Sequence, residues 1–354
     1  NFSAPGSSFD GYWCKLAHSI QNNLQTPTKD REWNDTPLAM TGVSDSESAS
    51  QISISSLLYF VRNPAKLFIN SRLHIYLGNE SLTDDDELFS PDSLQVYLLS
   101  QRLLDSDLHG TDLTIQQLKA EGELPHGIFA EPWLDTCDKN TEVIKQALKE
   151  YVTEEPQHCL VDLVLEDSNG EKIHLSGELH NIYQDQTLLR YKASKLKGSD
   201  ILALWLEHLV WCMIEPQQNK KSLLLCRDKT LSFNSSLSTD IARQHLIRYI
   251  GLYKKSKTQP LPVFPVASYE YARSLLDKSG HFDPAADIDK ALQKARTAWH
   301  GNSFNNAPSD KDDPYIQIIM RGVTTDPVLH KDFSLLAKEF YLSALEQSDI
   351  HEFY

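Results

Sequence analysis

Three side chains in one stretch of the sequence are of types that can bind ligands or take part in catalysis. In GELHNIYQDQTLLRYKAS, residues 177–194, Arg190 and Lys192 are two positions apart, and His180 lies ten residues before Arg190. Successive side chains of a strand alternate between its two faces, so the two cations share one face and can attract phosphate there. The ordinary interpretation is that the cations face solvent and that the histidine is a hydrogen-bonded structural residue.

Carboxylates in the same region allow a second chemistry. Glu178 lies on the predicted strand before the turn that contains Asp185, and Asp162 and Glu166 point to one side of the strand before that. Two such carboxylates together can hold a divalent cation near Lys192. The stretch is therefore a cutting site, the remains of one, or an ordinary hairpin.

The chain is acidic overall, but one part of it is basic. The net charge is −15 over 354 residues, whereas residues 190–257 contain 13 Lys and Arg against 5 Asp and Glu. Electrostatic attraction to phosphate is screened over about 8–10 Å, so a local basic face can hold DNA on an acidic protein. The alternative is a solvated basic surface without a partner. The candidate phosphate contacts are Arg190, Lys192, Lys195, Lys197, Lys220, Lys221, Lys254, Lys255 and Lys257.

Composition indicates a globular protein with a sizeable core. The chain is 40% hydrophobic and 23% charged. No apolar run approaches the roughly 18–20 residues of a membrane span, and the opening NFSAPGSSFDGYW has no signal-peptide pattern, which predicts a cytoplasmic protein without a membrane partner. The absent initiator Met predicts a piece of a longer polypeptide. An odd number of cysteines without a C-x-x-C pair argues against disulfides and zinc: Cys14, Cys137, Cys159, Cys212 and Cys226.

Hydrophobic periodicity divides the chain into three parts. Residues 1–50 are polar and predict an irregular connector from a preceding part of a longer polypeptide. Residues 51–157 predict a helical segment that packs on a sheet, with one helix capped by Ser55 or Ser56, a junction at Asn63-Pro64 and a break at Gly110. The acidic run over residues 84–87 predicts an exposed loop.

Residues 158–354 change to an alternating pattern and then return to helix. CLVDLVLED, KIHLSGELHNIY and TLLRYKAS predict three strands, SDILALWLEHLVWCMI predicts a helix, and SLLLCRD with TLSF predicts a hairpin. The remainder is mainly helical. These patterns predict an α/β (α+β) fold in which a central sheet is flanked by helices, with 51–354 as one compact unit. The predicted core stripe of the helix is Leu202, Trp205, Leu206 and Leu209.

Five segments in order carry a resemblance to a known family. They are SSLLYFVRNPAKLFINSRL, GELPHGIFAE, the sheet segment, LALWLEHLVWC and DKALQKARTAW, and together they cover about residues 50–300. The chain resembles the C-terminal part of the RecC family, the gamma subunits of exodeoxyribonuclease V. The resemblance implies a degenerate PD-(D/E)XK nuclease-like domain with a central mixed sheet.

The same resemblance implies a lost metal site. The related nucleases carry G-x-x-D on one strand and D-Y-K or E-x-K on the next, where two carboxylates hold Mg²⁺. This chain has GELH and RYK, so that His180 and Arg190 stand where carboxylates would, and only Lys192 matches. A guanidinium repels Mg²⁺, and a histidine replaces a hard oxygen ligand poorly. We therefore expect remnant positions, with no catalytic residue and no metal ligand.

Further expectations follow from the family. Asn63-Pro64 stands where some related nucleases have the Cys-Pro of an iron–sulfur site, and no Walker A pattern occurs, so no cofactor is expected here, and Mg²⁺ and ATP are expected only in partner subunits. The implied function is a non-catalytic domain of the RecBCD helicase–nuclease. It would guide or split DNA during double-strand end processing for recombinational repair, and scaffold the RecB and RecD subunits on a double-stranded end and its unwound single strand. The alternative is an active metal-dependent nuclease with relocated carboxylates around Lys192.

Overall fold

The computed structural model describes most of the chain after residue 50. The described parts are Trp33 and residues 51–77, 92–110, 113–125, 127–152, 154–167, 169–183, 186–214, 219–234, 237–301 and 309–353. The predicted connector, apart from Trp33, lies outside the described residues, as do the predicted acidic loop at 84–87 and Asp185. In the part of the chain that the structure describes, no helix is both long and apolar enough to cross a membrane.

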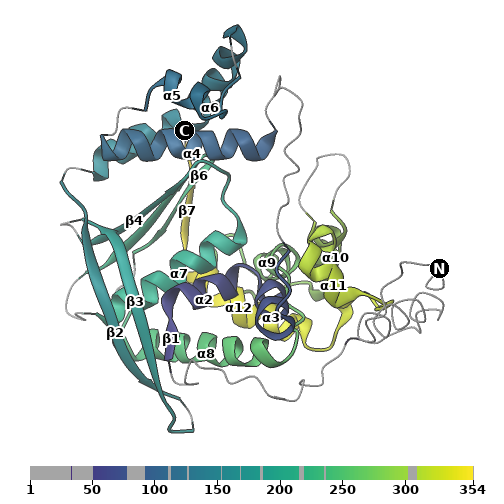
Figure 1. Cartoon of the computed structure of the whole chain (residues 1–354). Coiled ribbons are helices and arrows are strands. Elements are labelled where there is room, and N and C mark those ends of the chain that lie inside the picture. The colour runs from purple at the N-terminus through teal and green to yellow at the C-terminus, as the bar shows by residue number, and fades with distance from the viewer. Residues whose placement is uncertain are drawn as a thin grey trace, which may run out of the picture.

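A mixed sheet lies at the centre of the molecule (Figure 1). Among the described residues it has seven strands, in the order β1-β3-β4-β5-β6-β7, with β2 paired to β3 outside this path. The pairs β1/β3 and β4/β5 are parallel and the others are antiparallel. The bounds are β1 (Gln51–Ser53), β2 (Gln157–Glu166), β3 (Lys172–Ile182), β4 (Thr187–Lys192), β5 (Lys221–Cys226), β6 (Lys229–Phe233) and β7 (Asp349–Glu352). The expected mixed α/β fold is confirmed, as are the three predicted strands and the hairpin; β1 and β7 were not predicted.

Two strands share one edge of β3. Residues 174–176 of β3 pair with β1, whereas β4 meets β3 in register only at Ile182 and Leu188. The intervening stretch contains Gly177, where an added Cβ would lie 3.1–3.2 Å from side-chain atoms of Ile54 on helix α2 (Ile54–Arg62). The glycine of the GELH segment therefore allows α2 to approach the strand closely, in a backbone conformation (φ +153°) that L side chains rarely adopt.

Helices cover both faces of the sheet. On one face α2, α7 (Gly198–Met213), α8 (Thr239–Thr258) and α12 (Phe333–Gln347) surround a core that includes Trp205, Tyr249 and Phe340. On the other face α4 (Ser93–His109) and α6 (Ala130–Tyr151) pack Leu104 and Ile144 against β4 and β5. Figure 1 shows the strands between these two helical layers. The predicted stripe of α7 is confirmed as core, because its four members are at most 1% exposed.

Shorter helices complete the fold beside α12. The helices α3 (Pro64–Leu73), α9 (Ala267–Arg273), α10 (Ile288–His300) and α11 (Pro314–Met320) pack around Phe264, Trp299 and Phe333. Helix α5 (Ile115–Ala120) packs with α4 and α6. Short 3₁₀ turns occupy Gly127–Phe129, Asp310–Asp312 and Pro327–Leu329.

Local sequence explains several helix ends. The predicted junction is confirmed: α2 ends at Arg62, and the Asn63 side chain accepts a hydrogen bond from the Lys66 backbone at 3.0 Å to begin α3. The predicted cap of α2 was wrong by two or three residues. Ser53, at the end of β1, accepts from the Ser56 backbone at 3.0 Å, because the chain leaves the sheet directly into the helix.

Candidate functional site

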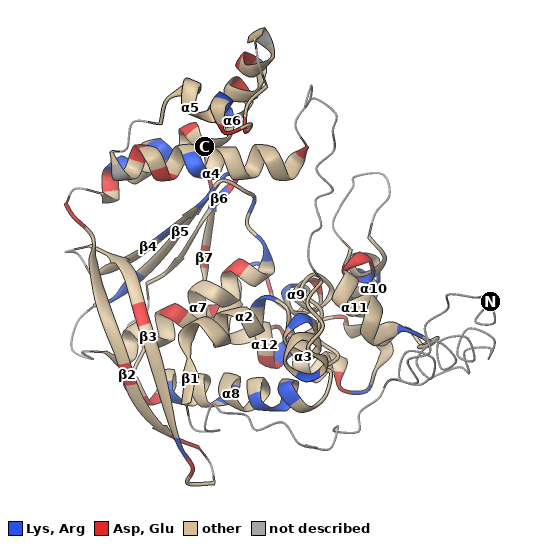
Figure 2. Cartoon of the chain, in the orientation of Figure 1, with Lys and Arg blue, Asp and Glu red and all other residues tan. Residues whose placement is uncertain are grey.

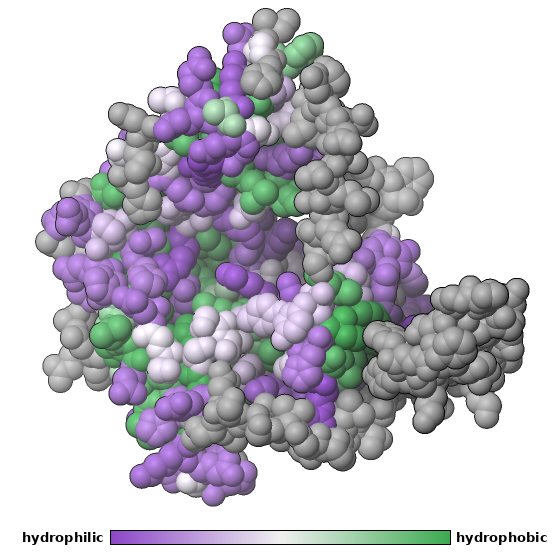
Figure 3. All heavy atoms as spheres, viewed as in Figure 1, coloured by the Kyte–Doolittle hydropathy of each residue, from purple (hydrophilic) through white to green (hydrophobic). Residues whose placement is uncertain are grey.

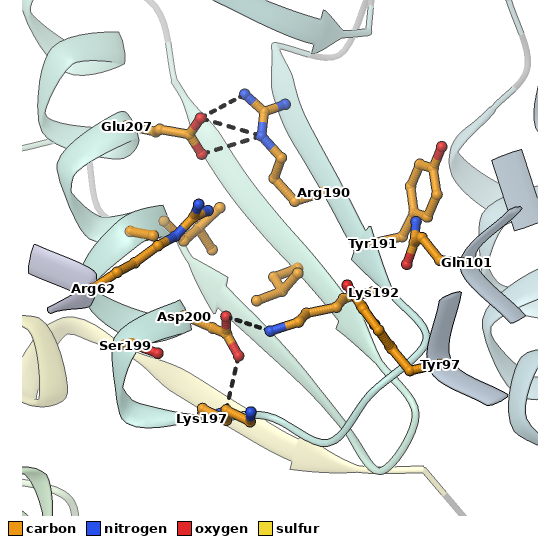
Figure 4. Close-up of a pocket in the computed structure, with 13 residues that line it drawn as sticks. Arg62, Tyr97, Gln101, Arg190, Tyr191, Lys192, Lys197, Ser199, Asp200 and Glu207 are labelled. Atoms are coloured by element: carbon orange, nitrogen blue, oxygen red, sulfur yellow. Dashed lines mark hydrogen bonds and ion pairs between the residues drawn. The ribbon is translucent and has the colours of Figure 1, made fainter. Parts of the chain in front are cut away.

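The two predicted cations on β4 line a hollow between the sheet and its helices (Figure 4). Its volume is about 530 Å³, and β4, α7, α2 and α4 all contribute to its wall. The charged side chains that line it are Arg62, Arg190, Lys192, Lys197, Asp200 and Glu207. The hollow thus contains four cations and two carboxylates.

Strand geometry explains which side chains of β4 face α7. Arg190 and Lys192 point to this helix, as the two-residue period predicted. Tyr191, between them, packs with the α4 and α6 layer, and its hydroxyl donates to Asp105 Oδ1 on α4 at 2.8 Å. Burial first, and then the bond to Asp105, holds the pKa of Tyr191 well above its ordinary value. The tyrosine fixes the orientation of the strand, so both cations are held toward α7.

Arg190 is fully engaged by protein groups. Its Nη2 and Nε donate to Glu207 Oε1 at 2.8 and 3.2 Å, and Nε also lies 3.1 Å from Oε2. Its Nη1 donates to the carbonyl of His180 at 2.6 Å and to that of Leu189 at 3.0 Å. The guanidinium therefore ties β4 to both α7 and β3, at the place where the regular pairing of β3 with β4 is confined to one register pair.

Lys192 has a matching carboxylate one turn into α7. Its Nζ donates to Asp200 Oδ1 at 2.9 Å, and the other oxygen of Asp200 accepts from the Lys197 backbone at 3.0 Å. Asp200 is 9% exposed and lies in the first turn of the helix, where the helix dipole favours a negative charge. This carboxylate thus anchors both the strand and the helix start.

The sequence made Arg190 and Lys192, on one face of β4, candidate phosphate contacts, and the structure shows what they bind within the chain. Each cation is neutralised by a carboxylate of α7, as the dashed lines in Figure 4 show. Sequence reasoning missed both partners, because they lie 8 and 17 residues away along the chain. A signal was present: Asp200 and Glu207 are seven positions apart, about two helical turns, so they lie on one side of α7.

Two cations of the hollow have no such partner. Arg62, at the end of α2, and Lys197, just before α7, are exposed, and neither forms an ion pair with another described residue. Lys197 was predicted as a phosphate contact, and the structure places it beside the β4 cations. Arg62 was not predicted, although its position in the last turn of a short helix was a usable signal. The free positive charge of the hollow lies on these two side chains.

The remaining remnant position is outside the hollow. The side chain of His180 is 61% exposed, and its Nε2 lies 3.6 Å from Glu178 Oε2, whereas only its carbonyl contacts Arg190. Asp162 and Glu166 are exposed on β2. Over the described ranges, no group of three or more His, Cys, Asp or Glu is arranged to hold a metal ion. Of the carboxylates considered for a relocated site, Glu178, Asp162 and Glu166 do not line the hollow that contains Lys192, and Asp185 lies outside the described residues.

The prediction that Lys220 faces phosphate was wrong. Lys220 is 3% exposed, and its ammonium donates to the carbonyls of Trp211 and Ile214 and lies 3.7 Å from the centroid of the Trp211 ring. The last carbonyls of a helix have no partner within it and carry a partial negative charge, which attracts a cation. Lys220 thus closes the C-terminal end of α7 and has no surface for DNA.

The other predicted lysines do not gather on one surface. Lys221 pairs in register with Thr187, at the end of β4 opposite Lys192, and its ammonium lies 5.2 Å from the ring centroid of Tyr151. Lys195 is exposed in the connection between β4 and α7. The charges of both signs are interspersed over the ribbon in Figure 2. The basic segment is therefore split by the fold.

The lysines at the end of α8 form a third location. Lys254 lies 3.3 Å from Glu171 and 3.8 Å from Asp167, which belong to the turn between β2 and β3. The ammonium of Lys257 lies 5.6 Å from the ring centroid of Tyr253, and Lys255 is exposed. Of this group, Lys255 has the least engaged charge.

Comparison with models of protein families identifies the family of this chain. The model of the RecC C-terminal domain matches residues 49–276, which include α2, α7, the hollow and most of the sheet. The chain belongs to the RecC family. The matched residues include the first four of the five sequence segments from which the resemblance was inferred. The resemblance to the RecC family is therefore confirmed.

Curated relatives agree with this assignment. The RecBCD enzyme subunit RecC of Escherichia coli (strain K12) is 28% identical over 283 residues, which is 78% of this chain and 24% of that protein. The subunit RecC of Buchnera aphidicola subsp. Schizaphis graminum is 28% identical over 77% of this chain and 25% of that protein. That of Haemophilus influenzae is 23% identical over 65% of this chain and 21% of that protein. The chain thus spans about a quarter of the length of these relatives.

Proposed function

We propose that this chain is a non-catalytic DNA-handling and assembly domain of a RecBCD-type helicase–nuclease. In this proposal it guides or splits DNA during the processing of double-strand ends for recombinational repair, and it supports RecB-type and RecD-type subunits. ATP hydrolysis and Mg²⁺-dependent cutting belong to those partner chains. The observation that carries the proposal is that the positions for nuclease carboxylates hold His180 and Arg190, with Arg190 locked to Glu207.

The contacts of the hollow argue against a metal-dependent reaction there. Mg²⁺ needs oxygen ligands in near-octahedral geometry, and phosphodiester hydrolysis on a metal needs carboxylates that are free to bind it. Asp200 and Glu207 are each committed to a cation of β4 at 2.8–2.9 Å. Releasing either carboxylate for a metal would leave a half-buried lysine or arginine without its counter-charge, which is strongly unfavourable.

The free charge of the same hollow favours phosphate. Arg62 and Lys197 line it, are exposed and have no described acidic partner. Arginine presents a fork of donors that matches phosphate oxygens, and a lysine adds a mobile point charge. The two side chains would hold the DNA backbone without reading its sequence, because phosphate contacts position DNA and base contacts specify it. We therefore expect equal affinity for unrelated DNA sequences.

Calorimetric titration of the 354-residue chain with Mg²⁺ and Mn²⁺, run with a DNA cleavage assay, tests the catalytic part of the proposal. We expect neither saturable binding nor cleavage. Saturable binding accompanied by cleavage would show that the carboxylates have moved and that the nuclease survives, and it would overturn the proposal.

Salt-dependent DNA binding tests the other part. Log affinity falls linearly as log salt concentration rises. Replacing Arg62 and Lys197 by Ala should make this fall shallower, by about 0.9 in slope per lost phosphate contact on duplex or about 0.7 on a single strand. The matched control is Lys294→Ala, an exposed lysine of α10 that does not line the hollow. If the double variant and the control keep the same slope as the wild type, the hollow does not contact DNA phosphates.

A further inference from the structure

A second hollow lies around α3 and reaches α2 at Tyr59. Its volume is about 640 Å³, which is within the range of small-molecule sites. Three tyrosines from three segments line it: Tyr59 on α2, Tyr76 just after α3, and Tyr315 on α11. Figure 3 shows hydrophobic and weakly polar side chains gathered on the visible face around the position of α3. No charge pair of the first hollow contributes to this one.

The fold holds the exposed tyrosine in place. His74 ends α3 in the left-handed conformation (φ 52°) and turns the chain. Three residues later, the Leu77 backbone N–H donates to the Tyr315 hydroxyl at 3.2 Å, and this hydroxyl lies 3.3 Å from the Leu77 carbonyl. Tyr76, directly before this contact, is 70% exposed. The Tyr76 ring is thus exposed to solvent, and the backbone of the next residue, Leu77, is held by the Tyr315 hydroxyl.

Two polar groups in the hollow are left without a full set of partners. Asn70 is 9% exposed; its Nδ2 donates to the Tyr59 hydroxyl at 2.6 Å, but its buried Oδ1 has no hydrogen-bond partner among the described residues. The ammonium of Lys66 lies 5.5 and 5.3 Å from the ring centroids of Tyr59 and Tyr315, and no described carboxylate pairs with it. The ammonium of Lys66 therefore keeps a positive charge that can attract a phosphate.

We propose that this hollow binds one unstacked base of single-stranded DNA, with the base on the Tyr76 ring and the adjacent phosphate at Lys66. The inference rests on the proposed function in taking DNA as the ligand. Aromatic platforms with a nearby cation are the recurrent way in which proteins hold single strands.

The chemistry of the lining favours a base over a protein segment. The hollow offers an exposed ring and a cation, which match the π-face and the phosphate of a nucleotide. Every DNA base has a π-face, so the Tyr76 ring can stack on all four without strong selection. Tyr59 and Arg62 are i and i+3 on α2 and therefore neighbours on its surface, so this hollow and the first one border the same helix. A strand held at one can continue to the other.

Binding of labelled oligo-dT and oligo-dA of about 12 nucleotides, a length within the usual site sizes, tests the proposal on the whole chain. Tyr76→Ala should weaken binding of both by about tenfold, as loss of one stacked base does. Tyr76→Phe is the matched control, because it keeps the ring and should bind as the wild type does. In addition, a 5-bromodeoxyuridine strand irradiated on the chain should cross-link to Tyr76, as located by mass spectrometry.

The outcomes separate this inference from the proposed function. If the wild type binds the strands and Tyr76→Ala binds them equally well, with cross-links elsewhere, the hollow holds no base. A loss of subunit association in Tyr76→Ala without a loss of strand affinity would instead assign the hollow to a protein partner and overturn the inference. If neither the wild type nor any variant binds single-stranded or duplex DNA, the proposed function itself is wrong, and the inference is wrong with it.

Discussion

The pair between Arg190 and Glu207 should be one of the costliest contacts to break. The side chain of Glu207 is 12% exposed and that of Arg190 is 24% exposed, and Nη2 and Nε of Arg190 donate to the carboxylate at 2.8–3.2 Å. Glu207→Gln keeps the shape but removes the charge, which leaves a largely buried guanidinium without its counter-ion. We expect this variant to lower the free energy of unfolding.

The magnitude follows from burial. Removing one partner of a buried pair costs roughly 3–5 kcal/mol, and since a quarter of Arg190 is exposed we expect about 2–4 kcal/mol. A pair at the surface is worth about 0–1 kcal/mol. Glu352→Gln is the matched control, because Glu352 is 76% exposed and pairs with Lys229 at 3.3 Å. It should change the free energy of unfolding by less than about 0.5 kcal/mol.

A double-mutant cycle separates the pair from its surroundings. Arg190→Met leaves Glu207 unpaired and should cost a similar amount, whereas Arg190→Met with Glu207→Leu removes both charges and should cost much less than the sum. The free energies come from urea unfolding followed by tryptophan fluorescence, for which Trp205 on α7 is a buried reporter. A coupling energy below about 0.5 kcal/mol would refute the conclusion that these two residues form one unit.

Three further predictions concern other parts of the fold. Burial raises the pKa of Asp310 to about 7, so the folded state holds the proton of this carboxyl more tightly than the unfolded chain does. The free energy of unfolding should therefore fall as pH rises from about 4 to 7, by an amount on the order of 4 kcal/mol. Urea unfolding of Asp310→Asn should show a weaker dependence on pH over the same range. Lys255→Ala should lower the salt slope of duplex binding by up to about 0.9, and Lys254→Ala by less because it is already paired with carboxylates; equal slopes would assign Lys255 to solvation. Gly198→Ala should cost about 1–3 kcal/mol in urea unfolding, because its Cβ would lie 2.6 Å from Tyr269; an unchanged stability would show that the ring can move aside.

Much of the local structure follows from the sequence because it depends on neighbouring residues. The alternation in CLVDLVLED and KIHLSGELHNIY predicted β2 and β3, and the apolar stripe of α7 predicted its buried side. Asn63-Pro64 predicted the α2–α3 junction, since both the cap and the fixed proline dihedral act within one turn. The family was predicted from short ordered segments and is confirmed by the match over residues 49–276.

The short edge strands were not predicted for a physical reason. β1 has three residues and β7 has four, and each exists only because a distant strand offers its edge. Such lengths give too few alternations to distinguish a strand from a loop. Their formation therefore depends on contacts with β3 and β6, which are distant from them in the sequence.

The sequence by itself determined that the GELH and RYK segments lie on neighbouring strands and that Arg190 and Lys192 share one face of β4. Only the tertiary structure decided what the cations do. Arg190 and Lys192 are neutralised by Glu207 and Asp200, while Lys220 is enclosed at the end of α7. The reason is that the charge of a side chain belongs to its sequence, whereas its partner and its exposure depend on which elements pack against it.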